Sequence, residues 1–485
     1  MVSRSTRCVR WSLSLLVAVL ILGTAHSVRA QSGASEAAGT NPFAAYLAAP
    51  DTAYAYELVR TVEQDAHTTH VLRMVSQQWL TEAQVDESTW WHWVTVIIPD
   101  TVEHDTALLW IGGGARDDAA PTAAPDFLVE AARATNSVVT HLHNVPFQPI
   151  RFAGDSERPR YEDALIAYGW RAFLEGGAHD EDAEWLARLP MTKAAQRAMD
   201  TVTAYARAEA ALNVEQFVVA GASKRGWTTW TTGIFDDRVV ALVPVVIDLL
   251  NMKPSFEHHW RAYGEWAPAI SDYEEAGIMA WQGSREYRRL RELVDPYAYR
   301  DRLTMPKFII NASGDQFFLP DSWQFYWNDL PGPKALRYVP NTGHSLDGTD
   351  AHESLIAFHE HIVTDAALPS FDWRVDDGTI HVTTDPEQPP SNLRVWTATN
   401  PDGRDFRVDV IGRSWTSRPI ERTADGHYEI TVDAPGQGYT AYFVEATFGD
   451  GRAVPLTRST GIVVTPDTYP HPPYAADAPK GTPIE

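Results

Sequence analysis

One stretch of the sequence decides the fold, and it reads Phe217-Val218-Val219-Ala220-Gly221-Ala222-Ser223-Lys224-Arg225-Gly226-Trp227. It opens with short apolar residues, as expected of a strand buried on both faces of a parallel sheet. Gly221 then permits a tight turn, because a Cβ at that position would crowd the backbone. A helical pattern begins near Gly226. The stretch therefore predicts a strand, a sharp turn and a helix, with the hydroxyl of Ser223 lifted above the edge of the sheet.

A serine on such a turn becomes a useful nucleophile when a base and an orienting acid accompany it. The strand predicted at Lys307–Asn311 is followed by Asp315, and the strand predicted at Leu336–Val339 is followed by His344. The order serine, aspartate, histidine is that of the catalytic triad in the α/β-hydrolase fold. We therefore predict this fold, with Ser223 as nucleophile, His344 as base and then acid, and Asp315 as the residue that orients the imidazole. Asp315 alone could be a turn residue, and His344 alone could be a helix cap. These alternatives do not account for the order of the serine, the aspartate and the histidine.

The turn departs from the usual Gly-x-Ser-x-Gly pattern, because Arg225 stands where the second glycine belongs and Gly226 follows one residue later. A glycine run that includes Gly113 and Gly114 follows another predicted strand. The backbone amides of these two glycines, together with the amide of Lys224, are predicted to form the oxyanion hole. An ordinary tight turn at the glycines is the alternative.

Lys224 and Arg225 place two positive charges beside the serine. Either could supplement the oxyanion hole or contact an acidic group of the substrate, and a salt bridge to one of the chain's many carboxylates is an equally good alternative. His258 and His259 are adjacent in sequence, so both cannot face one metal ion comfortably. The sequence therefore predicts no metal site, and the proposed chemistry needs no cofactor.

Residues 41–367 are assigned to the hydrolase domain, because strands and helices alternate through them as in a mostly parallel sheet covered on both faces. Residues 251–302 interrupt the alternation with a stretch rich in aromatic residues. We expect a helical cap whose Trp260, Trp266 and Trp281 bind substrate; a helical subdomain remote from the site is the alternative. The strands predicted in this domain are His70–Ser76, Trp93–Ile98, Ala107–Ile111, Ser137–Leu142, Gln216–Ala220, Leu242–Ile247, Lys307–Asn311 and Leu336–Val339.

Residues 368–466 change character, since short runs alternate apolar and polar residues between turn motifs. This pattern predicts a β-sandwich. The strands expected in it are Thr379–Thr384, Asn392–Thr399, Phe406–Ile411, His427–Val432, Tyr439–Phe448 and Gly461–Thr465. Residues 467–485 are rich in proline and poor in core residues, which predicts an extended or disordered tail.

The first thirty residues are typical of a secretory signal peptide. Three arginines precede the apolar run Trp11–Gly23, and Val28-Arg29-Ala30 forms a small-x-small cleavage site. We therefore expect a secreted or periplasmic protein without a membrane span after processing; a retained N-terminal anchor is the alternative. The chain's single cysteine, Cys8, lies inside this leader. Cysteine catalysis and disulfides are thus excluded for the processed chain.

The chain carries a formal net charge of −24 at pH 7. So acidic a protein is repelled by nucleic acid and by anionic lipid, so neither is an expected partner. A plain account of the charge is solubility in a salty environment, and it requires no specific cationic ligand.

A resemblance to a known family rests on several of these motifs. They are Trp90-Trp91-His92-Trp93, Leu109 to Gly114, Gly221 to Trp227, Ser313-Gly314-Asp315-Gln316-Phe317-Phe318 and Asn341-Thr342-Gly343-His344-Ser345. Together they resemble the PhoPQ-activated pathogenicity-related protein family from about residue 41 to residue 466. The resemblance implies an exported α/β-hydrolase-like protein with a C-terminal β domain, a link to regulated bacterial responses, and no settled substrate. The basic residue after Ser223 also resembles the turn of glucuronoyl esterases, but this likeness is local and transfers no substrate.

The predicted function is hydrolysis by acyl transfer through Ser223, His344 and Asp315. A small-molecule ester is the first choice of substrate, and a peptide bond is the second. The competing interpretation is a non-catalytic binding or signalling protein, related to virulence or stress, on a hydrolase scaffold. The intact triad argues against it, whereas an unsuitable oxyanion loop or a sealed pocket would favour it.

Overall fold

A computed structural model describes residues 41–449, 451–452 and 454–484. The predicted signal peptide lies outside these residues. Within them, nine strands form one sheet in the order β1-β2-β3-β5-β4-β6-β7-β8-β9. From β5 to β9 neighbouring strands run parallel, whereas β1, β2 and β3 pair antiparallel and β3 also meets β5 antiparallel. The strands are β1 (Ala55–Gln64), β2 (His67–Gln78), β3 (Thr89–Pro99), β4 (Thr106–Ile111), β5 (Val139–Leu142), β6 (Gln216–Ala222), β7 (Val239–Val245), β8 (Lys307–Ala312) and β9 (Lys334–Val339).

This topology is the predicted α/β-hydrolase fold, and every strand predicted in residues 69–359 is present. The strand that the sequence pattern missed is β1, at the edge of the sheet. Almost all of its residues are exposed, so it carries no alternation of apolar and polar residues by which a half-buried strand is recognised.

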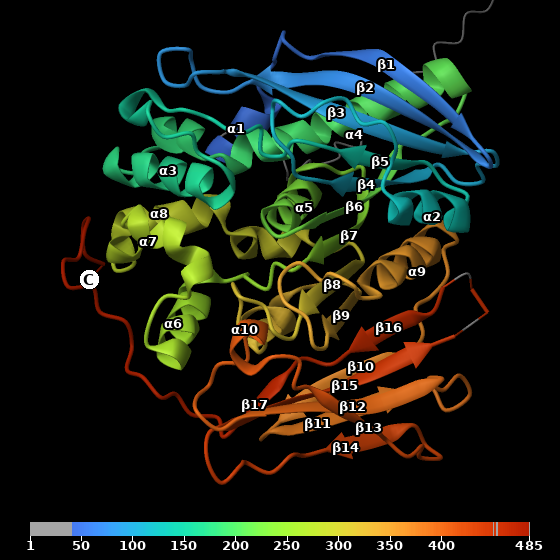
Figure 1. The fold of residues 1–485 in the computed structure, drawn as a ribbon, viewed down its shortest axis with the longest axis vertical. Coiled ribbons are helices and arrows are strands. Elements are labelled where there is room, and N and C mark those ends of the chain that lie inside the picture. Colours follow the sequence, from blue (N-terminus) through green and yellow to red (C-terminus); the bar gives the residue numbers. More distant parts are fainter. Residues whose placement is uncertain (1–40, 450, 453, 485) are drawn as a thin grey trace, which may run out of the picture. The chain divides into compact units, whose positions relative to one another are not determined.

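Helices cover both faces of the sheet (Figure 1). One face packs against α4 (Arg188–Ala210) and α5 (Lys224–Phe235), and α1 (Pro42–Ala48) packs on α4. The other face packs against α2 (Asp126–Thr135) and α9 (Ala351–Val363). The predicted helix at Lys193–Leu212 is α4, whose small residues Ala194, Ala198 and Thr201 are buried against the sheet as their spacing requires. No helix of the described chain is long and apolar enough to cross a membrane.

Residues 251–302 are helical, as predicted. They form α6 (Met252–Tyr263), η3 (Pro268–Ile270), α7 (Ser271–Glu275), η4 (Ile278–Trp281), α8 (Arg285–Val294) and η5 (Pro296–Arg302). Helix α3 (Glu162–Glu175), from the loop region after β5, packs against α7 and α8. This insertion leaves the sheet after β7, next to the end of β6, the strand that precedes Ser223.

Between residues 371 and 465, the described chain forms two antiparallel sheets that enclose a core of their own. One sheet contains β10 (Phe371–Asp376), β11 (Thr379–Thr384) and β14 (His427–Ile430). The other contains β12 (Asn392–Asn400), β13 (Thr416–Pro419), β15 (Tyr439–Phe448), β16 (Leu456–Ser459) and β17 (Val463–Thr465).

The strand predicted at Phe406–Ile411 is wrong. Its second half is the short helix α10 (Val408–Ile411). The alternation of apolar residues there does not reflect a sheet face, because Val410 is half exposed. The amide of Val408 instead donates a hydrogen bond to the carbonyl of Gly314 in the hydrolase domain, at 2.9 Å. This segment is thus shaped by contact with the hydrolase domain.

The C-terminal tail is extended, and it is bonded along the helical insertion. The amide of His471 donates to Arg261 O at 3.1 Å, that of Lys480 to Ala280 O at 2.9 Å, and that of Ile484 to Gly283 O at 3.1 Å. In Figure 1 the tail, in red, runs along the side of the molecule formed by α6, α7 and α8. The tail therefore belongs to the packed structure of the insertion.

Candidate active site

Ser223 lies at the junction of β6 and α5 with φ 59° and ψ −125°. This positive φ is unusual for a residue with a side chain and marks a strained turn. The turn is fixed because the Ser223 amide donates to the carbonyl of Val245 at 2.8 Å. A Cβ on Gly221 would lie 2.8 Å from the carbonyl oxygen of Arg225, which explains the glycine before the serine.

The displaced second glycine has an equally local explanation. A Cβ on Gly226 would lie 2.7 Å from Cγ2 of Ile247, 2.9 Å from the carbonyl of Gly221 and 3.0 Å from that of Val245. Helix α5 therefore approaches β6 and β7 closely at Gly226, and the departure from the usual motif does not disturb the turn.

Asp315 and His344 meet at the carboxyl ends of β8 and β9. Nδ1 of His344 lies 2.9 Å from Oδ2 and 3.0 Å from Oδ1 of the Asp315 carboxylate. Asp315 is buried, and its Oδ1 also accepts a hydrogen bond from the amide of Phe317 at 2.8 Å. The amide of His344 donates to Oε1 of Gln316 at 2.9 Å. The carboxylate thus orients the imidazole through Nδ1 and leaves Nε2 for another partner.

That second nitrogen is not bonded to Ser223. Nε2 of His344 is buried and has no hydrogen-bond partner among the described residues. The ring of Phe317 lies against the imidazole, with 4.3 Å between ring centroids. The structure therefore joins two members of the predicted triad and leaves the bond between His344 and Ser223 unmade.

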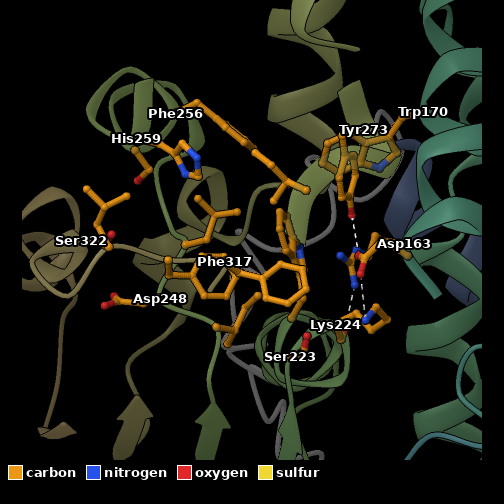
Figure 2. Close-up of a pocket in the computed structure, with 18 residues that line it drawn as sticks. Asp163, Trp170, Ser223, Lys224, Asp248, Phe256, His259, Tyr273, Phe317 and Ser322 are labelled. Atoms are coloured by element: carbon orange, nitrogen blue, oxygen red, sulfur yellow. Dashed lines mark hydrogen bonds and ion pairs between the residues drawn. The ribbon is translucent and has the colours of Figure 1, made fainter. Parts of the chain in front are cut away.

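Ser223 opens on a small pocket with a volume of about 50 Å³. Its wall is formed by residues from α3, α4, α5, the loop after β7, the helical insertion and the loop after β8. Figure 2 shows Phe317 near the middle of this pocket, with Asp248 and Ser322 on one side and Asp163, Lys224 and Tyr273 on the other. The lining residues include Asp163, Trp170, Arg188, Ser223, Lys224, Trp227, Asp248, Phe256, His259, Tyr273, Phe317 and Phe318.

The insertion lines this pocket through Phe256, His259 and Tyr273 rather than through the predicted tryptophans. Trp266 packs behind Phe256 and His259, with centroid distances of 6.0 Å and 5.6 Å.

The three tryptophans contact the protein's own tail. Trp260 and Trp266 pack on Tyr474 at 4.7 Å and 5.0 Å between ring centroids. Trp281 lies so close to Gly481 that a Cβ there would be 2.8 Å from the indole. The predicted aromatic cap is present, but the assignment of these three rings to substrate binding requires correction.

Lys224 and Arg225 are engaged by acidic residues of α3. Nζ of Lys224 lies 2.9 Å from Glu162 and 3.0 Å from Asp163. The guanidinium of Arg225 makes a two-pronged pair with Glu162, with Nη1 at 2.7 Å from Oε2 and Nη2 at 2.5 Å from Oε1. Although burial raises the pKa of Glu162, the two neighbouring cations lower it to about 2. The charge of Arg225 is thus paired with Glu162, which is the salt-bridge alternative that the sequence analysis left open.

The glycine run lies against Arg225. A Cβ on Gly113 would lie 2.5 Å from Nη2 of Arg225, and Gly114 has φ 129°, which favours glycine. The carbonyls of Gly113 and Gly114 accept hydrogen bonds from the amide of Asn144 at 2.8 Å and from Nε2 of Gln148 at 2.9 Å. Lys224 lines the pocket with Ser223, whereas these two glycines are not among its described lining residues. Close packing and the positive φ therefore explain why glycines stand at these two positions, without a role in an oxyanion hole.

His258 and His259 point to different partners, as their adjacency suggested. His258 bonds to the hydroxyl of Tyr469 and to Oδ1 of Asp321, both at 2.8 Å. Nε2 of His259 accepts a hydrogen bond from the amide of Ala267 at 3.0 Å. Burial lowers the pKa of His259 to about 3, so this pocket residue is neutral near pH 7.

Three features escaped sequence reasoning. The C-terminal domain supports the His344 loop: the amide of Trp415 donates to Oδ1 of Asn341 at 2.9 Å, and Nδ2 of Asn341 donates to the carbonyl of Trp415 at 2.9 Å. Arg188 is buried at the start of α4 and lines the pocket. Asp248, after β7, lines it as well. Like Asp315, Asp248 comes shortly after a strand of the parallel sheet. This position in the sequence could have identified it as a candidate site residue.

Comparison with known proteins gives the chain's relatives. Residues 43–407 match the model of a family described as PhoPQ-activated pathogenicity-related protein. The chain is 38% identical over 461 residues to autocrine proliferation repressor protein A of Dictyostelium discoideum, covering 89% of this chain and 92% of that protein. Among solved structures, an acetyl xylan esterase from Paenibacillus sp. R4 covers 66% of this chain and 92% of its own, with 14% identity and a TM-score of 0.46. A glucuronoyl esterase from Solibacter usitatus covers 68% and 92%, with 14% identity and a TM-score of 0.38.

Proposed function

From the premise that this chain belongs to the PhoPQ-activated pathogenicity-related protein family, we propose that it is an exported serine hydrolase that cleaves an ester bond. The observation that carries the proposal is the strained turn at Ser223, which opens on a pocket and lies in the same fold as a bonded Asp315–His344 pair. Strain of this kind persists where the surrounding structure enforces it, and it gathers at active sites.

In the proposed reaction, Oγ of Ser223 attacks the substrate carbonyl and its proton passes to Nε2 of His344. Asp315 keeps Nδ1 protonated and stabilises the imidazolium, while the amide of Lys224, at the N-terminus of α5, faces the developing oxyanion. The proton then goes to the departing alcohol, and water releases the acid by the reverse sequence of steps. Nε2 of His344 has no other partner among the described residues, so it is available for this role after a change in side-chain position.

Phe317 is the residue that must move for this to happen. Its ring lies against His344 and lines the Ser223 pocket at the same time. A bound substrate that displaces this ring would bring the imidazole and the serine together. Catalytic hydrogen bonds that are long in a free enzyme commonly tighten when substrate binds.

An ester is preferred over a peptide because the pocket is small and mostly apolar. A peptide substrate needs an extended groove that pairs with its backbone, whereas a short acyl group needs a compact enclosure. Export by the leader described above would place the reaction outside the cytoplasm.

The test is labelling with a fluorophosphonate, which reacts with activated serines of any substrate class. We expect the wild-type protein to be labelled, with the probe on Ser223, and labelling to be lost in Ser223→Ala and strongly slowed in His344→Ala. Ser345→Ala is the matched control, since Ser345 is an exposed serine next to His344 and its removal should leave labelling unchanged. Labelling of Ser223→Ala at the wild-type rate would refute the proposal.

A second candidate is a non-catalytic binding protein on this scaffold. The unmade bond between His344 and Ser223 favours it, and the Dictyostelium relative is named as a repressor of proliferation. If this candidate is right, wild-type protein will resist the probe even at high concentration. Phe317→Ala separates the two, because removal of the ring frees His344 in an enzyme and does not create a nucleophile in a binding protein.

A further inference from the structure

Three helices begin beside the Ser223 pocket. Helix α3 begins at Glu162, α4 at Arg188 and α5 at Lys224. The N-terminus of a helix carries a partial positive charge, so it stabilises anions and destabilises cations placed in its first turn. Glu162 obeys this preference, whereas Arg188 and Lys224 are buried cations in first turns and oppose it.

The charged residues in this cluster do not balance among themselves. Lys224 pairs with Glu162 and Asp163, and Arg225 pairs with Glu162. Arg188 has no carboxylate within ion-pair distance among the described residues; burial lowers its pKa, while the nearby Tyr273 and Asp163 raise it. Among these five described side chains, three cations therefore face two carboxylates, which leaves an excess of one positive charge. A buried charge without a partner is costly, unless a ligand supplies the partner.

The geometry of Arg188 suits an anionic ligand. Its side chain is 2% exposed and lines the same pocket as Ser223. Nη1 donates to the carbonyl of Lys224 at 2.8 Å, and Cζ lies 4.3 Å from the centre of the Trp227 ring. Nε is buried and has no hydrogen-bond partner among the described residues. The stacked ring and the carbonyl hold the guanidinium in place, and its remaining donors can bind both oxygens of a carboxylate.

We propose that Arg188 binds a free carboxylate on the acyl group of the substrate, so that the preferred substrates are monoesters of short dicarboxylic acids. This deepens the proposed function and rests on it. The acyl group is the part held here because it stays on the serine after the alcohol has left, which suits an enclosed pocket. A volume of about 50 Å³ admits a chain of a few heavy atoms.

The rest of the pocket is consistent with a carboxylate at this end. Asp248, which would repel it, lies on the opposite side of Phe317 from Lys224 and Tyr273 (Figure 2). The hydroxyl of Tyr273 donates to Oδ1 of Asp163 at 3.0 Å, so this acid is held by Tyr273 and Lys224. Although Tyr273 and Asp163 also raise the pKa of Arg188 against the effect of burial, Arg188 is the cation among these side chains without a carboxylate at ion-pair distance.

The test compares two esters of the same size and shape. Monomethyl succinate ends in a carboxylate, and methyl 4-methylpentanoate ends in an isopropyl group in its place. In both, the bond from Oγ of Ser223 to the carbonyl carbon forms as methanol leaves, and water then releases the acid. We expect kcat/KM of the wild-type protein to be roughly 10- to 100-fold higher for the charged ester, as for a hydrogen-bonded charged group.

The variants assign this preference to one side chain. Arg188→Met should abolish the preference, measured within each protein as the ratio of kcat/KM for the two esters, while Arg188→Lys should keep part of that ratio. Arg207→Met is the matched control, because Arg207 lies on the same helix with an exposed side chain, and it should behave as wild type. Equal kcat/KM for the two esters in the wild-type protein would overturn the inference and leave the proposed function standing.

A binding measurement keeps the inference testable if neither ester is hydrolysed. Monomethyl succinate is titrated into the full processed chain by calorimetry, with the wild-type, Arg188→Met and Arg207→Met proteins side by side. Binding that Arg188→Met abolishes and Arg207→Met retains supports the carboxylate site, even where failure of labelling at Ser223 refutes the hydrolase. Absence of binding to the wild-type protein, or equal binding by all three, overturns the site.

Discussion

Asp248 should make the protein less stable as the pH rises through neutrality. Its carboxyl is buried, with 2% of the residue exposed. Burial raises its pKa from 3.8 to about 7, although hydrogen bonds from the hydroxyls of Tyr326 and Tyr338, each at 2.5 Å, favour the ionised form. The nearby carboxylates of Asp315 and Asp321 raise it further. The folded protein therefore holds a proton on Asp248 that the unfolded chain releases.

The size of the effect follows from linkage between proton binding and folding. Between the unfolded pKa of 3.8 and the folded pKa of about 7, the folded state binds one more proton, so the free energy of unfolding falls by about 1.4 kcal/mol per pH unit. The stabilisation is complete below the unfolded pKa and is lost as the pH rises through the folded pKa. From pH 5.5 to pH 8 the loss due to Asp248 amounts to about 2 kcal/mol.

The perturbation is Asp248→Asn, which keeps the shape of the side chain and removes its titration. Urea unfolding followed by tryptophan fluorescence at pH 5.5 and pH 8 gives the free energy of unfolding for each protein. The drop between the two pH values should be about 2 kcal/mol larger for the wild-type protein than for the variant. Histidines that titrate in this range are common to both proteins, so they cancel.

Asp433→Asn, at an exposed position in the β domain, controls for the loss of a carboxylate as such. It should show the wild-type drop. If Asp248→Asn also shows the wild-type drop, Asp248 is ionised throughout the range, and the reasoning from its burial is refuted.

Two further substitutions test the packing around the site. Gly226→Val should reduce fluorophosphonate labelling and lower the unfolding midpoint, because its Cβ would meet Ile247 at 2.7 Å and two carbonyls. Gly436 is exposed and has open space around it, so Gly436→Val should change neither labelling nor the midpoint. A Gly226→Val protein that is labelled normally would contradict the close approach of α5 to β6 and β7. Arg404→Met should destabilise the protein by roughly 3–5 kcal/mol, because it removes the guanidinium that lies 2.6 Å from the buried Asp321 and leaves this carboxylate with its hydrogen bond from His258. Urea unfolding measures this loss, with the exposed Arg374→Met as control, and a loss below about 1 kcal/mol would count against the pair.

Features that depend on neighbouring residues could be predicted from the sequence. The alternation of strands and helices, the turn at Ser223 and the placement of Asp315 and His344 after successive strands are of this kind. Each depends on local backbone preferences or on the order of elements in a parallel sheet. The edge strand β1 escaped because its exposed residues carry no pattern of burial.

Features that depend on a distant partner could not be predicted. The aromatic content of the insertion indicated contact with something large and apolar, and Trp260 and Trp266 do make such a contact. Their partner is Tyr474, more than two hundred residues away in a segment whose composition suggested disorder. A tryptophan packs equally well on a substrate or on a tyrosine, so its identity cannot distinguish between the two.

The same limit applies to the position of His344. The loop that carries it is held by Asp315 through the imidazole, by Gln316 through the backbone, and by Trp415 of the β domain through Asn341. None of these contacts reaches Ser223, which is fixed separately by β6, β7 and α5. Ser223 and the Asp315–His344 pair are therefore positioned by different parts of the chain, and Phe317 is a side chain that contacts His344 and also lines the pocket of Ser223. Spacing in the sequence predicts the participants of the proposed triad, whereas in our proposal their meeting depends on movement of this one aromatic ring.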